Sequence, residues 1–218
     1  MTCHFWTKRR LAWGLGTLWL LSILIALGSL RFLVAEMSLV MPAMVHHLLA
    51  HPVVLYLHIG LAPVALALLP MQFSHRLRGR RPGLHRWGGR LYALCVLMSG
   101  LASLWLAYTT AEGVVAGFGF ALLAVVWLAT TAMAVIAALH RRFARHRAWM
   151  IRSAALTLAA VTLRLYLPIG VITVGFEASY PVIAWICWVP NLVAAEWLLR
   201  REARGAVPAG RALHQLMY

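Results

Sequence analysis

Long apolar runs constrain this chain more than any other feature of its sequence. Six of them, about 20 residues or longer, occupy 11–30, 53–73, 91–109, 114–139, 154–176 and 180–199. A helix rises about 1.5 Å per residue and the hydrocarbon core of a bilayer is about 30 Å thick, so each run is long enough to cross it. In lipid, helices satisfy their own backbone hydrogen bonds. The sequence therefore predicts an all-α protein, one domain over 1–218, built as a bundle of six transmembrane helices.

The positive charges predict how this bundle is oriented. Of the 20 Lys and Arg residues, three precede the first run, six follow the second, five follow the fourth and four follow the sixth. Those 18 residues fall on one side of the membrane, which the positive-inside rule makes the cytoplasmic side. We therefore expect a bacterial inner-membrane protein with both termini in the cytoplasm. The same asymmetry explains the formal net charge of +15 without a nucleic-acid partner.

The first run resembles a signal peptide because Lys8, Arg9 and Arg10 precede it. Its apolar stretch is too long for a signal peptide, and no A-x-A cleavage site follows, so we interpret it as a retained anchor. The connection after it, 31–52, is long enough for an interfacial helix that begins at Pro42. His47 and His51 lie four residues apart in this connection and would share a helix face. Together with nearby methionines they are candidate copper or zinc ligands, although the methionines also suit apolar packing.

Polar residues inside the runs are expensive in a bilayer and indicate function. Arg164 lies about 15 Å into the fifth run, near the midplane. Asn191 follows Pro190, which removes a backbone donor, and Glu196 lies nearer the inner surface. We predict that Arg164, Asn191 and Glu196 form one polar cluster, either as a working site or as a clamp between helices. Gln72 ends the second run and adds a further polar group.

Histidines and arginines recur at the inner ends of the helices. His75, His85, His140 and His146 lie at one depth, and His58 lies in the outer third of the second run. Such imidazoles are candidate ligands of a haem b iron, with His58, His85 and His146 foremost. Four arginines would then hold its propionates: Arg86, Arg90, Arg147 and Arg152. The same residues equally suit contacts with anionic lipid headgroups.

Several motifs resemble a bacterial family of predicted membrane proteins, the domain of unknown function DUF2306. They include His58, Pro70-Met71-Gln72-Phe73, His85-Arg86-Trp87, Gly89-Arg90-Leu91-Tyr92, His146-Arg147, Trp149-Met150-Ile151-Arg152-Ser153, Thr162-Leu163-Arg164 and Trp188-Val189-Pro190-Asn191-Leu192 with Glu196-Trp197. The resemblance runs from about residue 58 to residue 196. It implies a membrane protein and carries no established activity, cofactor or catalytic residue.

Three functions remain open from the sequence. The leading one is a haem-associated or redox protein that exchanges electrons with a membrane partner. The second is a carrier of a small anion or a proton, centred on Arg164 and Asn191. The third is a non-catalytic assembly or lipid-interaction protein. With only five acidic residues in the chain, no paired-carboxylate or serine–base arrangement identifies an enzyme.

Overall fold

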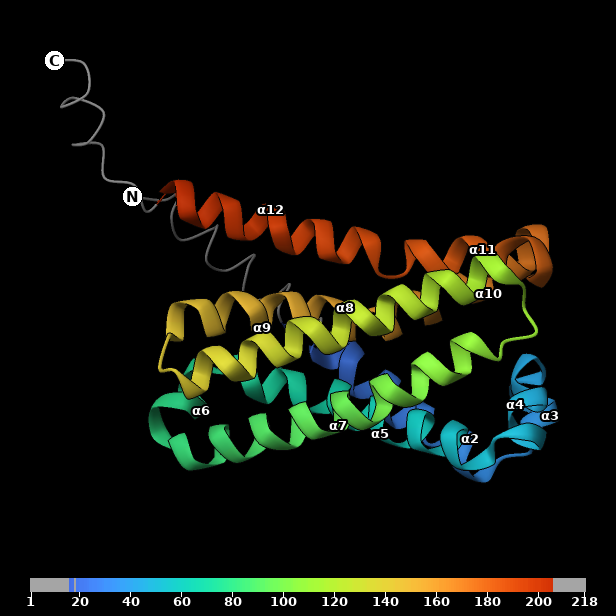
Figure 1. Cartoon of the computed structure of the whole chain (residues 1–218), viewed down its shortest axis with the longest axis horizontal. Helices are drawn as coiled ribbons and strands as arrows, with labels where there is room; N and C mark the ends of the chain where they lie inside the picture. The colour runs from blue at the N-terminus through green and yellow to red at the C-terminus, as the bar shows by residue number, and fades with distance from the viewer. Residues whose placement is uncertain (1–15, 18, 206–218) are drawn as a thin grey trace, which may run out of the picture.

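The computed structural model describes residues 16–17 and 19–205, and this part of the chain is almost entirely helical. A first helical segment covers Trp19–Val34 and includes α2 (Arg31–Val34). The elements that follow are α3 (Met37–Val40), η1 (Pro42–Met44), α4 (Val45–Ala50), α5 (Pro52–Phe73), α6 (His75–Arg80), α7 (Pro82–Tyr108), α8 (Val114–Leu139), α9 (Phe143–Thr157), α10 (Ala159–Val174), α11 (Phe176–Ile186) and α12 (Val189–Gly205). The long helices run along one common axis (Figure 1).

Five helical stretches of the described chain are long and apolar enough to cross a membrane. They are Pro52–Phe73, Pro82–Tyr108, Val114–Leu139, Phe143–Val174 and Phe176–Arg204. They confirm the helical membrane bundle and five of its predicted spans. The predicted first span lies partly outside the described residues, and its described part forms the shorter apolar helix Trp19–Val34.

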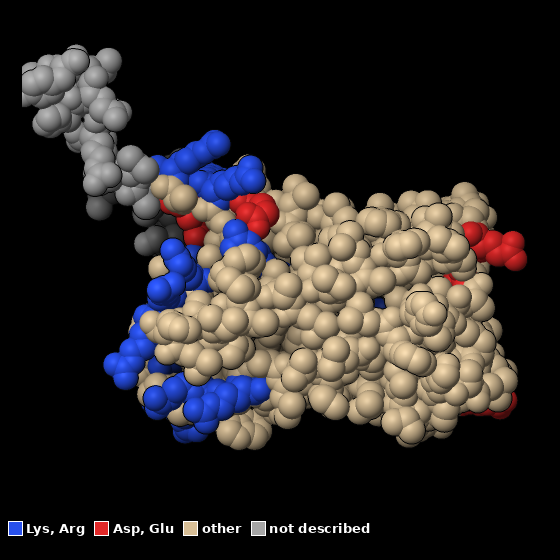
Figure 2. Space-filling view, viewed as in Figure 1, with Lys and Arg blue, Asp and Glu red and all other residues tan. Residues whose placement is uncertain are grey.

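Charged side chains gather at the ends of the bundle. Figure 2 shows Lys and Arg concentrated at one end, which we call the basic end. There α6 joins α7, α8 turns into α9, and α12 ends. Glu112, between α7 and α8, and Glu177, in the first turn of α11, belong to the opposite end. The separation agrees with the charge pattern of the sequence.

The basic segments extend the helices instead of forming loops. α7 begins at Pro82, nine residues before the predicted apolar run, and α9 begins at Phe143, eleven residues before its run. Proline at the first helical position loses no hydrogen bond, and arginine is a good helix former. α7 and α9 therefore begin within the basic segments and continue into the apolar runs, because no residue between the two parts ends the helix.

Two of the spans are interrupted within the bilayer region. α9 and α10 meet at Leu158, where the amide of Val161 also bonds to the Leu158 carbonyl at 2.9 Å. α11 and α12 are separated by Cys187 and Trp188, just before Pro190. Pro190 cannot donate to the carbonyl four residues earlier, so the helix ladder is open there. At the second of these breaks, Thr162 and Asn191 lie beside the backbone carbonyl of Cys187.

Candidate functional site

Arg164 lies on α10, six residues beyond the interruption at Leu158, and its side chain is half-buried. Its guanidinium has five N–H donors. Among the described residues, its one hydrogen bond runs from Nη1 to the carbonyl oxygen of Ala160, 3.1 Å away on the same helix. The two ion pairs of the described chain involve Arg147 and Arg152 instead. Arg164 therefore carries a charge without a carboxylate partner.

A second cation approaches the same place. The buried ring of Phe32, on α2, has the Cζ of Arg31 at 4.8 Å from its centroid and the Cζ of Arg164 at 5.9 Å. The two guanidinium charges are close enough to interact, and that interaction is repulsive. Phe32 also packs with Leu55 and Ile59 of α5, on either side of His58. Arg31, Phe32, His58 and Arg164 together form what we call the arginine site.

Asn191 makes different contacts from those predicted. Its side-chain nitrogen lies 3.1 Å from the carbonyl oxygen of Cys187, 3.2 Å from the hydroxyl of Thr162 and 3.3 Å from the carbonyl oxygen of Ala155. Thr162 also donates to the Cys187 carbonyl. Both side chains thus satisfy the backbone where α11 and α12 separate, and they tie that break to the α9–α10 junction. Asn191 acts here as a clamp.

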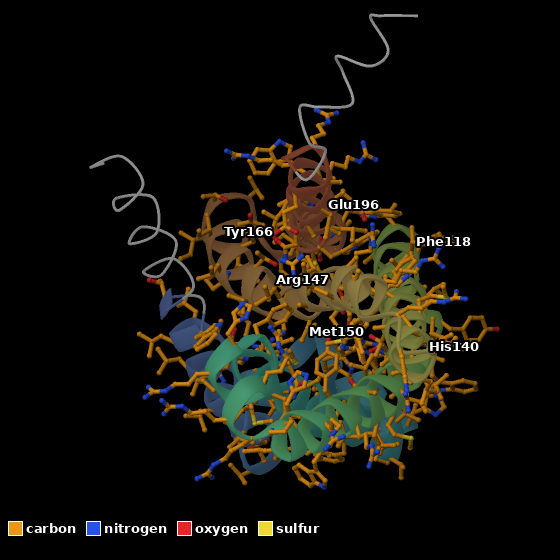
Figure 3. All side chains as sticks on the ribbon, turned by 90° about the vertical axis from the view of Figure 1, so that its left-hand side faces the viewer. Phe118, His140, Arg147, Met150, Tyr166 and Glu196 are labelled. Atoms are coloured by element: carbon orange, nitrogen blue, oxygen red, sulfur yellow. The ribbon has the colours of Figure 1, made fainter. Side chains whose placement is uncertain are left out.

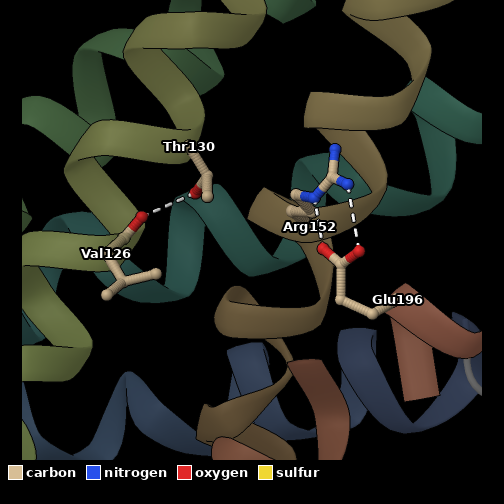
Figure 4. A network of polar contacts seen from close by, with 4 residues as sticks. All are labelled: Val126, Thr130, Arg152 and Glu196. Atoms are coloured by element: carbon tan, nitrogen blue, oxygen red, sulfur yellow. Dashed lines mark hydrogen bonds and ion pairs between the residues drawn. The ribbon is translucent and has the colours of Figure 1, made fainter. Parts of the chain in front are cut away.

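Glu196 forms an ion pair between α12 and α9. Its carboxylate accepts hydrogen bonds from both Nε and Nη2 of Arg152, the latter at 3.1 Å (Figure 4). Arg147 and Glu202 repeat this bidentate contact nearer the basic end, at 2.6 and 2.9 Å. Figure 3 looks onto this end and shows Arg147 between the ribbons of α9 and α12. Among the described residues, Arg164, Asn191 and Glu196 each bond to other partners, and Arg147 and Arg152 pair with glutamates.

Gln72 and His85 meet where α5 and α7 pack at the basic end. With the Gln72 amide turned to match its neighbours, its nitrogen donates to Nδ1 of His85 at 3.3 Å and its oxygen accepts from the amide of Gly89 at 3.0 Å. A Cβ at Gly88 would overlap the terminal methyl of Met71 and lie 2.7 Å from the side-chain amide of Gln72. The glycine pair lets these helices approach. Because Nδ1 of His85 accepts, its neutral ring carries the proton on Nε2.

His146 and His140 have the other tautomer. Nδ1 of His146 lies 2.9 Å from the carbonyl oxygen of Ala134, and Nδ1 of His140 lies 2.9 Å from that of Ile136. A carbonyl only accepts, so Nδ1 carries the proton and Nε2 is free to bind a proton or a metal. His85, on α7, and His146, on α9, both lie near the basic end of the bundle. Arg86 and Arg90 are exposed at the same end.

The histidines at the end opposite the basic end link α4 to the α7–α8 connection. His46 Nε2 accepts from the amide of Ala111 at 3.2 Å, and the buried His47 lies 3.4 Å from the hydroxyl of Thr109. His51 packs edge-on against Trp105 just after α4 ends. Within the described residues, no group of three or more His, Cys, Asp or Glu side chains is placed to hold a metal ion. The nearby Met37, Met41 and Met44 pack in an apolar cluster.

The sequence analysis did not identify a buried chain of hydroxyl groups between α7, α8 and α9. The Tyr92 hydroxyl lies 2.7 Å from the hydroxyls of both Ser153 and Thr157. Ser153 in turn lies 2.7 Å from Thr131, and the Trp127 indole donates to Thr157 at 2.9 Å. Small hydroxyl residues are frequent in transmembrane helices, so composition alone could not identify these positions. The network joins the three helices where they cross.

Comparison with known proteins gives one match. Residues 55–199 match the family model described as predicted membrane protein (DUF2306). The match covers most of the length of the five spans and most of the polar contacts described above. No curated protein and no solved structure matches the chain.

Proposed function

Because the chain belongs to the DUF2306 family of predicted membrane proteins, we propose a function within the bilayer: it binds a small anion at the arginine site and carries it across the membrane. The observation that carries this proposal is the unpaired charge of Arg164. A cation in the bilayer needs a partner. Intramembrane arginines generally pair with an opposite charge or line the path of a substrate.

The acidic residues are fully accounted for elsewhere. All five lie in the described part of the chain. Glu196 and Glu202 pair with Arg152 and Arg147, and Glu36 accepts from the Ser38 hydroxyl at 2.6 Å. Glu112, between α7 and α8, and Glu177, in the first turn of α11, lie at the end opposite the basic end. A solute anion would supply the missing charge, and it would also relieve the repulsion between Arg31 and Arg164.

The helix interruptions support movement as well as binding. Transporters often form their substrate sites from discontinuous helices near the bilayer midplane. Here α10 carries Arg164 shortly after one interruption, and Thr162 and Asn191 connect that junction to the break between α11 and α12. A change of angle at Leu158 would move Arg164 relative to Phe32 while the ion pairs between α9 and α12 hold the basic end together.

Anion flux into proteoliposomes tests the proposal. Liposomes containing the purified chain are given an inward chloride or nitrate gradient, with potassium and valinomycin to balance charge. Wild-type protein is expected to take up anion, and the uptake rate of Arg164→Ala is expected to be at least tenfold lower. Arg201→Ala, which removes an exposed arginine near the end of α12, serves as the matched control.

The outcome is decisive only for folded protein, so each variant is first checked by gel filtration and thermal unfolding. Equal uptake by wild type and Arg164→Ala would disprove the anion site. Arg164→Lys keeps the charge but loses the planar fork, and it should retain part of the rate if charge is the main requirement.

A haem-associated role is a second candidate, and one observation favours it. His85 and His146 both lie at the basic end, and Nε2 of His146 is free to ligate. Ligation by His85 would require Gln72 to release Nδ1, and Arg147 and Arg152 would have to leave their glutamates to hold propionates. We therefore place this candidate second. Protein purified after expression with haem tests it: a Soret band lost in His146→Ala supports haem binding, and its absence from wild type contradicts it.

We also propose that the basic end faces the cytoplasm in a bacterial inner membrane, with the chain termini on that side. The support is the charge asymmetry of Figure 2 and the positive-inside rule. Exposed arginines there, among them Arg76, Arg86, Arg90 and Arg145, would contact anionic lipid headgroups.

A further inference from the structure

His58 belongs to the arginine site by its neighbours. It lies on α5 between Leu55 and Ile59, which pack against Phe32. The same Phe32 ring faces the guanidinium of Arg164. The charges of His58 and Arg164 are close enough to interact. Two guanidinium groups therefore face the Phe32 ring, and His58 lies on the α5 segment that packs in the same cluster.

The hydrogen bonds of His58 fix which ring nitrogen carries the proton. Nδ1 lies 2.8 Å from the Ser103 hydroxyl and 3.1 Å from the Ser99 hydroxyl. The Ser103 hydroxyl donates its own hydrogen to the Ser99 carbonyl at 2.8 Å, so it accepts from His58. Neutral His58 thus has its proton on Nδ1 and a lone pair on Nε2. That lone pair can receive a second proton.

The surrounding elements offer no negative charge to stabilise a protonated His58. Arg164 interacts with it from α10 and Arg31 approaches from α2, while α7 contributes the hydroxyls of Ser99 and Ser103 and the Ser99 carbonyl oxygen, which lies 3.4 Å from Nδ1. Protonation alone would add a third positive charge to this group. A bound anion would remove that penalty, and a protonated His58 would strengthen the anion's binding by the same factor, since linkage is reciprocal.

We propose that the arginine site takes up a proton together with its anion, with Nε2 of His58 as the proton acceptor, so that the chain moves an anion and a proton in the same direction. This inference rests on the proposed anion site and adds the second ion. The balance is simple: the anion pairs with Arg164, the proton makes His58 an imidazolium, and release of both restores the starting state. No net charge crosses the membrane in such a cycle.

The test uses the same proteoliposomes, loaded with the pH indicator pyranine, and an inward chloride or nitrate gradient. For the wild type we expect the interior to acidify as the anion enters, at a rate that valinomycin and potassium do not increase. His58→Gln keeps a hydrogen-bonding side chain but cannot be protonated. It should take up anion without acidification, and its uptake should now require valinomycin. His140→Gln, an exposed histidine at the basic end, is the matched control.

Binding in detergent gives a second readout. Chloride affinity, measured by calorimetry against a gluconate background, should weaken with rising pH in the wild type, by at most about tenfold per pH unit, the limit for one linked proton. His58→Gln should remove this dependence.

The outcomes separate the two proposals. If Arg164→Ala takes up anion like the wild type, the anion site itself is wrong. If Arg164→Ala loses uptake but wild-type uptake is electrogenic and leaves the internal pH unchanged, the anion site stands and the proton coupling is wrong. Acidification by His58→Gln at the wild-type rate would also overturn the coupling.

Discussion

Removing the hydroxyl of Tyr92 tests how much the buried hydroxyl network contributes to the stability of the protein. Tyr92 is 1% exposed and contacts Ser153 and Thr157. Tyr92→Phe keeps the ring and leaves those hydroxyls short of a partner, so it should destabilise the protein by about 1 kcal/mol. Tyr108→Phe, at an 83% exposed tyrosine, should have no effect. Thermal unfolding in detergent measures both, and equal midpoints would show that the network is dispensable.

His47 makes stability depend on pH. Burial, reinforced by the charges of His46 and His51, lowers its pKa from 6.5 to about 4. The unfolded chain therefore binds a proton more readily than the folded one below pH 6.5. Above pH 6.5 both states leave His47 neutral and its titration does not affect stability. As the pH falls from 6.5 toward 4, the free energy of unfolding decreases by at most about 3 kcal/mol.

His47→Gln tests this prediction by unfolding over the range from pH 7.5 to 4. The wild type should lose stability more steeply than the variant as the pH falls. Parallel curves for the two proteins would contradict a lowered pKa at His47.

Between helices, the pairs that join α9 and α12 should differ in strength. The Arg152–Glu196 side chains are 22% and 32% exposed, whereas those of Arg147–Glu202 are 53% and 42% exposed. Water screens the second pair more, so its coupling in a double-mutant cycle should stay below about 1 kcal/mol. The first pair should couple more strongly. Glu196→Gln alone should also cost more than Glu196→Gln with Arg152→Met, because the single change leaves a half-buried cation unpaired.

Chemical denaturation of the four proteins in each cycle measures these couplings. Equal coupling energies in the two cycles would mean that exposure does not decide the strength of these pairs.

Element by element, the sequence predicted what depends on length and left open what depends on packing. Of the six spans that the apolar runs predicted, five match helices of the described chain, because hydrophobic length is a local property. Arg164, Asn191 and Glu196 were found as expensive residues for the same reason. Their partners were not predictable, since Arg152 on α9 and Glu196 on α12 are 44 residues apart, with α10 and α11 between them. The approach of Arg31 to Arg164 likewise depends on how the helix before α3 packs.

For the molecule as a whole, the charge asymmetry predicts which end a reagent reaches from outside the cell. In a Cys3→Ser background, Glu112→Cys should react with a membrane-impermeant maleimide in intact cells. Arg141→Cys, between α8 and α9, should react only after the membrane is permeabilised. Cys95 and Cys187 are buried and should contribute little background. The reverse labelling pattern would place the basic end outside.

The scarcity of carboxylates has a practical consequence for anyone who handles this protein. If its intramembrane arginine is neutralised by a solute, then the anion of the buffer salt becomes part of the folded molecule. We expect protein prepared in chloride to unfold at a higher temperature than protein in gluconate at equal ionic strength, by an amount that grows with the logarithm of chloride concentration. Arg164→Ala should unfold at the same temperature in both salts, so the choice of salt in a purification would itself report on the site.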